Sequence, residues 1–152
     1  MVAAVVGLDV GTSAVRAVML DDTGAFVTRE VQRLPAGRRT DDGGHLLDEA
    51  AILAAAEETL ENVCFRGRVR AAAVAVSATA GTLCFRDENN QAVGEAVAYD
   101  DLRHGDGLAR VAAWLRELPA ARRVIPLADA VLERFGAEPG GTDWTNARAL
   151  GW

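Results

Sequence analysis

The most constraining feature of this chain is a short polar turn between two apolar runs near the N-terminus. The first run ends in Gly7-Leu8-Asp9-Val10, the turn is Gly11-Thr12-Ser13, and a second apolar run carries Arg16. Apolar runs of this length on either side of a glycine turn are typical of β-strands. The chain is therefore expected to open with a hairpin whose first strand ends at the carboxylate of Asp9.

The polar groups of this hairpin suit a phosphate anion together with its metal ion. Gly11 permits close approach of the backbone, while Thr12, Ser13 and Arg16 can donate hydrogen bonds to phosphoryl oxygens. Asp9 can orient Mg²⁺ through water, because that ion keeps much of its hydration shell. These residues predict a site for ATP and Mg²⁺. The alternative is an ordinary glycine turn between two strands.

Composition limits the possible classes of protein. The 152 residues are 50% apolar, enough for a buried core in one domain or in part of a larger one. The net charge of −6 argues against a nucleic-acid surface, which is basic. No run has the length of a membrane span, and the start does not resemble a signal peptide, so we expect a cytoplasmic protein without nucleic-acid or membrane partners. All 16 basic residues are arginine, which excludes a P-loop lysine.

Hydrophobic periodicity predicts an α/β fold. Three consecutive strands with tight turns come first, and the continuously apolar first strand is expected to be covered on both faces. Segments with helical spacing follow, separated by further strands. The expected strands are Ala3–Val10, Ala14–Leu20, Ala25–Leu34, Ala71–Val76, Thr82–Arg86 and Ala92–Tyr99. The expected helices are Glu49–Cys64, Leu108–Leu115 and Pro126–Phe135. Together they indicate a mixed sheet, opening with three antiparallel strands, with helices packed on it.

The cysteines and histidines show no metal or disulfide pattern. Cys64 and Cys84 lack the spacing of either kind of site and are expected in or near the core. His45 lies in a glycine-rich stretch and His104 follows Arg103. Both are expected to be solvent-exposed loop residues rather than metal ligands or catalytic bases.

Two further segments, taken with the hairpin, resemble a known family. Residues 77–81 form a small polar turn after a strand, and Tyr99-Asp100-Asp101-Leu102-Arg103 matches an aromatic-x-Asp-x-Arg pattern. Three later segments continue the same order: Ala113–Glu117, Pro126–Asp129 and Thr142–Ala147. In order and spacing the chain resembles the N-terminal part of the FGGY family of carbohydrate kinases, nearest the xylulokinase and ribulokinase branch. The resemblance spans essentially all of the chain and implies the ribonuclease H-like fold of an actin-like ATPase N-terminal domain.

The resemblance also implies roles for the matched residues. The residues implied at the phosphate groups of ATP are Asp9, Gly11, Thr12, Ser13 and Arg16, with Asp9 holding Mg²⁺ through water. The residues implied at the sugar are Ser77, Thr79, Ala80, Gly81, Asp101 and Arg103. ATP and Mg²⁺ are the implied cofactors. The implied substrate is a small sugar or polyol, first of all a ketopentose such as xylulose or ribulose.

The chain departs from the family pattern within the sugar-binding part. Xylulokinases carry a Met-His pair, and glycerol kinases an Arg-Glu pair, where this sequence has Ala80-Gly81, so no particular sugar is indicated. The stretch between Arg103 and Trp114 is also shorter than usual. In the family, that stretch includes a helical segment that helps line the sugar cleft.

The family's general base and adenosine pocket lie further downstream than Trp152. We therefore expect residues 1–152 to be a single N-terminal domain, without a catalytic base and inactive alone, that pairs with a C-terminal lobe or a second copy. Asp143 is expected to cap a helix or turn rather than replace the base. Two alternatives stay open: a non-catalytic actin-like nucleotide-binding or assembly module, and a degenerate kinase.

Overall fold

The computed structural model describes residues 4–149 and shows two compact units. The first unit comprises Met1–Pro35 and Ala50–Ala78, and the second comprises Ala36–Glu49 and Thr79–Trp152. Among the described residues, no helix is both long and apolar enough to cross a membrane. The single domain over residues 1–152 stays a prediction.

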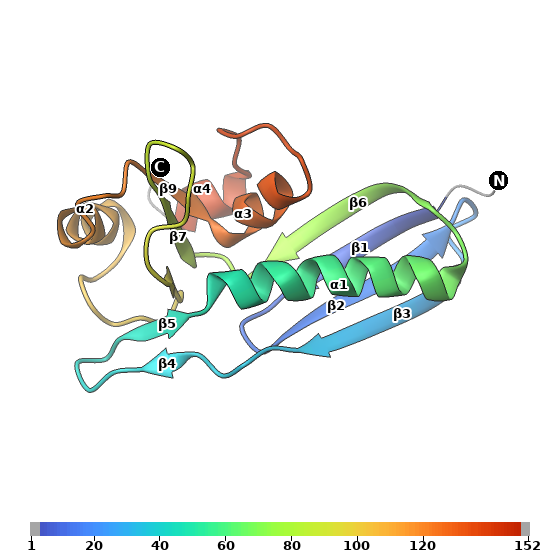
Figure 1. Ribbon diagram of the computed structural model, residues 1–152, viewed down its shortest axis with the longest axis horizontal. Helices are drawn as coiled ribbons and strands as arrows, with labels where there is room; N and C mark the ends of the chain where they lie inside the picture. The colour runs from blue at the N-terminus through green and yellow to red at the C-terminus, as the bar shows by residue number, and fades with distance from the viewer. Residues whose placement is uncertain (1–3, 150–152) are drawn as a thin grey trace. The chain divides into compact units, whose positions relative to one another are not determined.

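The first unit is a four-stranded mixed sheet with a long helix beside it (Figure 1). Its strand order is β3-β2-β1-β6, where β1, β2 and β3 are successive antiparallel neighbours and β6 runs parallel to β1. A parallel pair requires a long crossover, and the chain between β3 and β6 includes α1. The bounds are β1 Ala4–Val10, β2 Ala14–Asp21, β3 Phe26–Arg33, α1 Glu49–Gly67 and β6 Ala71–Ala78. The predicted opening of three antiparallel strands is confirmed.

Helix α1 covers one face of this sheet. Leu8 of β1 and Met19 of β2 are buried on the sheet side, and Ile52 and Val63 are buried on the helix side. At the end of the helix, a Cβ atom on Gly67 would lie 2.5 Å from the sulfur of Met19. The helix therefore finishes against the sheet at a position where only glycine fits without a shift of Met19.

The other face of the sheet is open in this chain, which corrects the expectation that β1 is covered on both sides. Burial alternates strictly along β1, with Val5, Gly7 and Asp9 exposed. On the neighbouring strand, Val18 is 40% exposed. The reason lies in the sequence: the apolar run of β1 contains a glycine and a carboxylate at alternate positions, and alternation is the pattern of a strand buried on one face.

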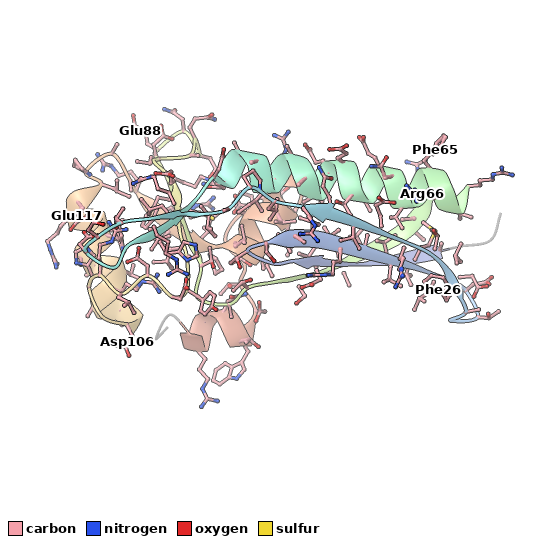
Figure 2. All side chains as sticks on the ribbon, turned by 90° about the horizontal axis from the view of Figure 1, so that it is seen from below. Phe26, Phe65, Arg66, Glu88, Asp106 and Glu117 are labelled. Atoms are coloured by element: carbon pink, nitrogen blue, oxygen red, sulfur yellow. The ribbon has the colours of Figure 1, made fainter. Side chains whose placement is uncertain are left out.

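The first unit exposes further large apolar side chains at the end where α1 finishes. Phe26 at the start of β3 is 63% exposed, and Phe65 near the end of α1 is 84% exposed. Figure 2 shows both at the same end, near Arg66. Arg66 forms an ion pair with Glu30 of β3, at 2.9 Å between Nε and a carboxylate oxygen.

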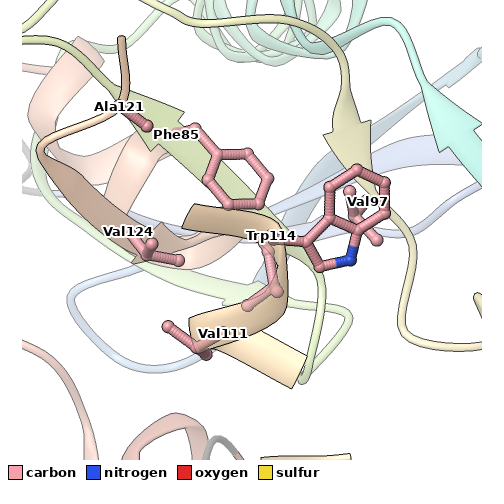
Figure 3. Close-up of a cluster of buried hydrophobic side chains, with 7 residues drawn as sticks. Phe85, Val97, Val111, Trp114, Ala121 and Val124 are labelled. Atoms are coloured by element: carbon pink, nitrogen blue, oxygen red, sulfur yellow. The ribbon is translucent and has the colours of Figure 1, made fainter. Parts of the chain in front are cut away.

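The second unit contains a five-stranded sheet of short strands, in the order β4-β5-β8-β7-β9, with all paired neighbours antiparallel. The strand bounds are β4 Arg38–Arg39, β5 His45–Leu47, β7 Leu83–Arg86, β8 Ala96–Val97 and β9 Arg123–Pro126. The helix bounds are α2 Gly107–Glu117, α3 Leu127–Arg134 and α4 Trp144–Ala149. The core includes Phe85 of β7, Val97 of β8, and Val111 and Trp114 of α2 (Figure 3).

Several elements of the second unit differ from the sequence-based expectation. The expected strand Ala92–Tyr99 is reduced to β8, with an isolated bridge between Ala92 and Arg86. Strands β4, β5 and β9 and helix α4 were not expected, and α3 begins one residue after Pro126. These strands have two to four residues each, too few for a periodic signal to emerge from the sequence.

Candidate functional site

The turn at Gly11-Thr12-Ser13 joins β1 to β2 in the first unit. The N–H of Gly11 donates to the carbonyl of Ala14 at 3.0 Å and closes the turn, and the carbonyl of Ser13 accepts from Leu34 at 3.0 Å. A Cβ atom on Gly11 would lie 3.3 Å from the oxygen of Ala14. Glycine therefore allows the turn to be this tight.

Polar groups of the turn remain free to bind a ligand. Within residues 4–149, no hydrogen bond engages the backbone N–H or the hydroxyl group of Thr12 or Ser13. Ser13 is exposed and Thr12 is half-buried. Backbone N–H groups and hydroxyls without internal partners are the groups with which proteins hold phosphoryl oxygens.

Three polar side chains stand in one row across the sheet beside this turn. Asp9 of β1 lies opposite Arg16 of β2 and opposite Ser77 of β6 in the strand register. The guanidinium Nη1 of Arg16 lies 3.1 Å from Oδ2 of Asp9, and both side chains are about half exposed, at 50% and 55%. The structure therefore brings together the predicted phosphate residues and one predicted sugar residue, Ser77, on the open face of the first unit.

This row fits a hydrated Mg²⁺ better than a metal bound by protein ligands alone. Within the described residues, no group of three or more His, Cys, Asp or Glu side chains could hold a metal ion. A single exposed carboxylate is enough for Mg²⁺, which keeps several water ligands and binds through one or two carboxylates plus phosphate. Asp9, Thr12, Ser13 and Arg16 thus have the chemistry required for a magnesium nucleotide.

The other predicted sugar residues lie in the second unit. Thr79, Ala80 and Gly81 form the turn before β7, and Gly81 has a φ of +80°. A Cβ atom on Gly81 would lie 3.4 Å from Cβ of Tyr99, so the two backbone segments approach each other with no side chain between them at this point. Tyr99 itself is 54% exposed.

Asp101 and Arg103 form a largely buried ion pair that holds its own loop. The carboxylate of Asp101, which is fully enclosed, accepts from Nη2 of Arg103 at 2.7 Å and from the backbone N–H of His45 at 2.7 Å. Burial opposes the charge of Asp101, but these hydrogen bonds outweigh burial and lower its pKa. The guanidinium of Arg103 also lies 4.6 Å from the ring centroid of Trp114. This geometry suits a pair that supports its loop, and the role of both residues at the sugar stays a prediction.

The structure corrects the expectation that His45 is an exposed loop residue, whereas His104 does lie in a loop but is half-buried. His45 is buried in β5, where Nδ1 lies 2.6 Å from a carboxylate oxygen of Asp100. Asp100 also binds Arg39, at 2.7 Å. His104 stacks edge-on against Trp114, with ring centroids 5.2 Å apart. No sequence signal indicated this burial, because β5 has only three residues and Asp100 lies far from His45 in the sequence.

Asp143 takes the capping position that the sequence predicted. Its Oδ1 accepts from the backbone N–H groups of Thr145 at 2.7 Å and Asn146 at 3.0 Å, at the start of α4. These bonds, with that of Asn146 first, lower the pKa of Asp143. Its carboxylate is therefore committed to the helix start. The position of Trp152 lies outside the described residues.

Comparison with models of known protein families shows to which family this chain is related. The profile of the N-terminal domain of the FGGY family of carbohydrate kinases matches residues 4–118. The chain belongs to the FGGY family of carbohydrate kinases. The match includes the hairpin at Gly11 and the Tyr99–Arg103 segment, so the resemblance drawn from those motifs is confirmed. Comparison with curated protein sequences gave no match.

Solved structures agree with this FGGY assignment at the level of fold. A gluconate kinase from Lactobacillus acidophilus aligns with a TM-score of 0.77 and 16% identity over 87% of this chain and 33% of its own. A ligand-bound xylulose kinase from the same organism gives 0.74 and 18%, over 86% of this chain and 33% of its own. A xylulose kinase from Rhodospirillum rubrum gives 0.73 and 16%, over 85% and 34%. This FGGY chain thus spans about one third of the length of the kinases it matches.

Proposed function

We propose that this chain is the N-terminal portion of an ATP-dependent carbohydrate kinase. The complete enzyme would transfer the γ-phosphoryl group of ATP to a hydroxyl of a small sugar or polyol, with a ketopentose such as xylulose or ribulose as the first candidate. The observation that supports this most directly is the free polar turn at Thr12 and Ser13 beside Asp9 and Arg16, within an FGGY domain.

In this proposal each residue of the hairpin has a separate task. The N–H and hydroxyl groups of Thr12 and Ser13 hold phosphoryl oxygens, and Arg16 adds a positive charge near them. Asp9 orients the water shell of Mg²⁺. When bound, that ion would neutralise charge on the phosphate groups. The protein's contribution is thus positioning and electrostatics, with no covalent step.

We further propose that residues 1–152 alone do not phosphorylate a sugar. Phosphoryl transfer needs the attacking and leaving oxygens held in line by groups on both sides of the site. Asp143 is committed to capping α4. The resemblance to the family implies a general base in a segment downstream of Trp152. The activity would therefore need a partner. The first candidate is the C-terminal lobe, and the second is another copy of the chain. The cytoplasm, which supplies ATP and sugars, is the proposed location.

A degenerate kinase is the second candidate, and one observation favours it. Ala80 and Gly81 offer no polar side chain to a sugar, and the φ of +80° at Gly81 disfavours any other residue there. A binding partner descended from a kinase would tolerate such a turn. An assembly module of the actin-like kind is less favoured, because the family match extends over the Tyr99–Arg103 segment.

A titration of the chain with sugars, monitored by nuclear magnetic resonance, tests the kinase proposal. The ¹⁵N-labelled chain is titrated with D-xylulose, D-ribulose, D-gluconate and glycerol, and a coupled assay measures ADP release with Mg-ATP present. We expect amide shifts at residues 77–81 with at least one ligand, and no ADP release above the blank. Absence of shifts with all four compounds favours the degenerate kinase. Sugar-dependent ADP release contradicts the proposed dependence on a second lobe.

A further inference from the structure

Arg110 is a buried cation that none of the motifs includes. It lies on α2, is 6% exposed, and among the described residues has no carboxylate within ion-pair distance. Burial is the main cause that lowers its pKa. A guanidinium in such a place is costly unless its N–H groups are bonded. The hydrogen-bond partners of the Arg110 guanidinium therefore indicate its role.

The guanidinium donates to backbone carbonyls of two separate segments. Nη2 binds the carbonyl oxygen of Ala98, while Nη1 lies 3.4 Å from the carbonyl oxygen of Gly81 and 3.5 Å from that of Tyr99. Gly81 belongs to the small turn and the other two precede the Asp101–Arg103 pair. One rigid fork of donors thus bridges the two segments to which the sugar-binding residues of this unit belong.

The two bridged segments are in close contact where the guanidinium joins them. The 3.4 Å approach between the Cβ position of Gly81 and Cβ of Tyr99 leaves no room for an intervening side chain. Arg110 belongs to α2, an element separate from both bridged segments. The guanidinium therefore supports the turn from α2.

We propose that Arg110 is a positioning residue that fixes the Thr79–Gly81 turn against the Ala98–Asp101 segment, so that both face the sugar in one arrangement. This inference rests on the proposed function, because it takes these two segments to be sugar-binding. Arg110 acts through the backbone of Gly81, Ala98 and Tyr99 and does not itself touch the substrate. A buried apolar side chain would fill the space but bind no carbonyl.

Carbonyl chemical shifts of the full chain test the bridge directly. ¹³C resonances of the Gly81, Ala98 and Tyr99 carbonyls are compared in the wild type, Arg110→Met and Arg110→Lys, with Arg116→Met as control, since Arg116 is exposed on the same helix. We expect Arg110→Met to move all three resonances. Arg110→Lys is expected to move those of Gly81 and Tyr99, because one ammonium group cannot reproduce the fork. Arg116→Met is expected to move none.

Three results would overturn the bridge. In the first, the three resonances stay at their wild-type positions in Arg110→Met. In the second, carbonyl resonances of the core strands, such as those of Cys84 and Val124, move as far as those of the turn, which indicates a packing role. If Arg110→Met does not fold, Arg110→Lys decides, and unchanged resonances in that variant contradict the proposal.

Sugar affinity distinguishes a positioning role of Arg110 from a purely structural role. With D-xylulose as the probe, or whichever of the four compounds binds the wild type, we expect Arg110→Met to weaken binding at least about tenfold and Arg110→Lys to recover part of the loss. Unchanged affinity despite moved carbonyl resonances refutes the positioning role. No sugar binding by the wild type refutes the proposed function itself, while the carbonyl shifts still report on the bridge.

Discussion

At the scale of residues, the backbone conformation of Gly81 and the buried charge of Asp101 are the features of the second unit on which stability is expected to depend. Gly81 adopts the left-handed region at φ +80°, which side chains other than glycine rarely adopt. Asp101 keeps a buried negative charge by binding Arg103 and a backbone N–H group. Both residues were named from motifs, but the sequence contained no information on the φ angle or on which partner the carboxylate would find.

Replacement of Gly81 by alanine is expected to destabilise the protein by about 1–2 kcal/mol, the cost of a left-handed conformation for an L-residue. Urea denaturation measures the change. Gly7→Ala is the matched control, because Gly7 lies in β1 with no atom within 4 Å of the Cβ position. That control should be neutral or stabilising by up to about 1 kcal/mol. Equal effects of the two substitutions would contradict the assigned conformation.

The buried carboxylate of Asp101 predicts a specific dependence of stability on pH. Its pKa is lower in the folded protein than the ordinary value of 3.8. Its contribution is therefore complete above that value and lost as the pH falls through the folded pKa. We expect the free energy of unfolding to fall on acidification below about pH 4, with a shallower fall in Asp101→Asn. The substitution should cost about 2 kcal/mol at pH 7.

Denaturation curves between pH 2.5 and pH 7 check this dependence. Asp22→Asn is a suitable control, since that carboxylate is exposed. An Asp101→Asn variant with the same slope as the wild type would show that the charge of Asp101 does not stabilise the fold.

At the scale of elements, the long segments were predictable and most short ones were not, with the exception of the four-residue strand β7, which was expected over Thr82–Arg86. The three opening strands, α1 and β6 have runs of seven to nineteen residues, long enough for hydrophobic spacing to dominate. Strands β4, β5, β8 and β9 have two to four residues, and β5, β8 and β9 pair with strands that are distant in sequence. For the same reason the burial of His45 next to Asp100 could not be read from the chain.

The open face of the first sheet makes an element-scale prediction about β2. Val18 on the open face should accept lysine with a change within about 0.5 kcal/mol. Met19, its buried neighbour on the helix side, should lose about 2–5 kcal/mol on replacement by alanine. Thermal or urea denaturation of both variants gives the comparison. A loss at Val18→Lys as large as that at Met19→Ala would mean that this face is covered in solution.

The buried ion pair between Glu49 and Arg86 predicts strong coupling between the two positions. Nη1 of Arg86 lies 3.0 Å from Glu49, and both side chains are less than 10% exposed. Removing one partner leaves the buried charge of the other unpaired, so Arg86→Met should lower the free energy of unfolding by about 3–5 kcal/mol. The double variant Glu49→Met with Arg86→Met should recover most of that loss, because no charge remains. A double-mutant cycle in urea measures it, and additive losses would contradict the coupling.

At the scale of the whole molecule, the family could be predicted from the sequence, but the activity could not be established. Several motifs in order identified the FGGY family, which the match over residues 4–118 confirms. The roles of individual residues stay predictions, because they depend on ligands and on the remaining two thirds of the length of related kinases. The structure adds what motifs cannot carry: the free N–H groups of Thr12 and Ser13, the row of Asp9, Arg16 and Ser77, and the buried fork of Arg110.

The most direct test of the account is titration of the ¹⁵N-labelled chain with Mg-ATP. We predict saturable amide shifts centred on Gly11, Thr12 and Ser13, and weaker binding in Arg16→Met, with a further loss when Mg²⁺ is replaced by EDTA. Amide resonances of this turn that stay unchanged at millimolar Mg-ATP would contradict the central claim that the hairpin binds phosphate.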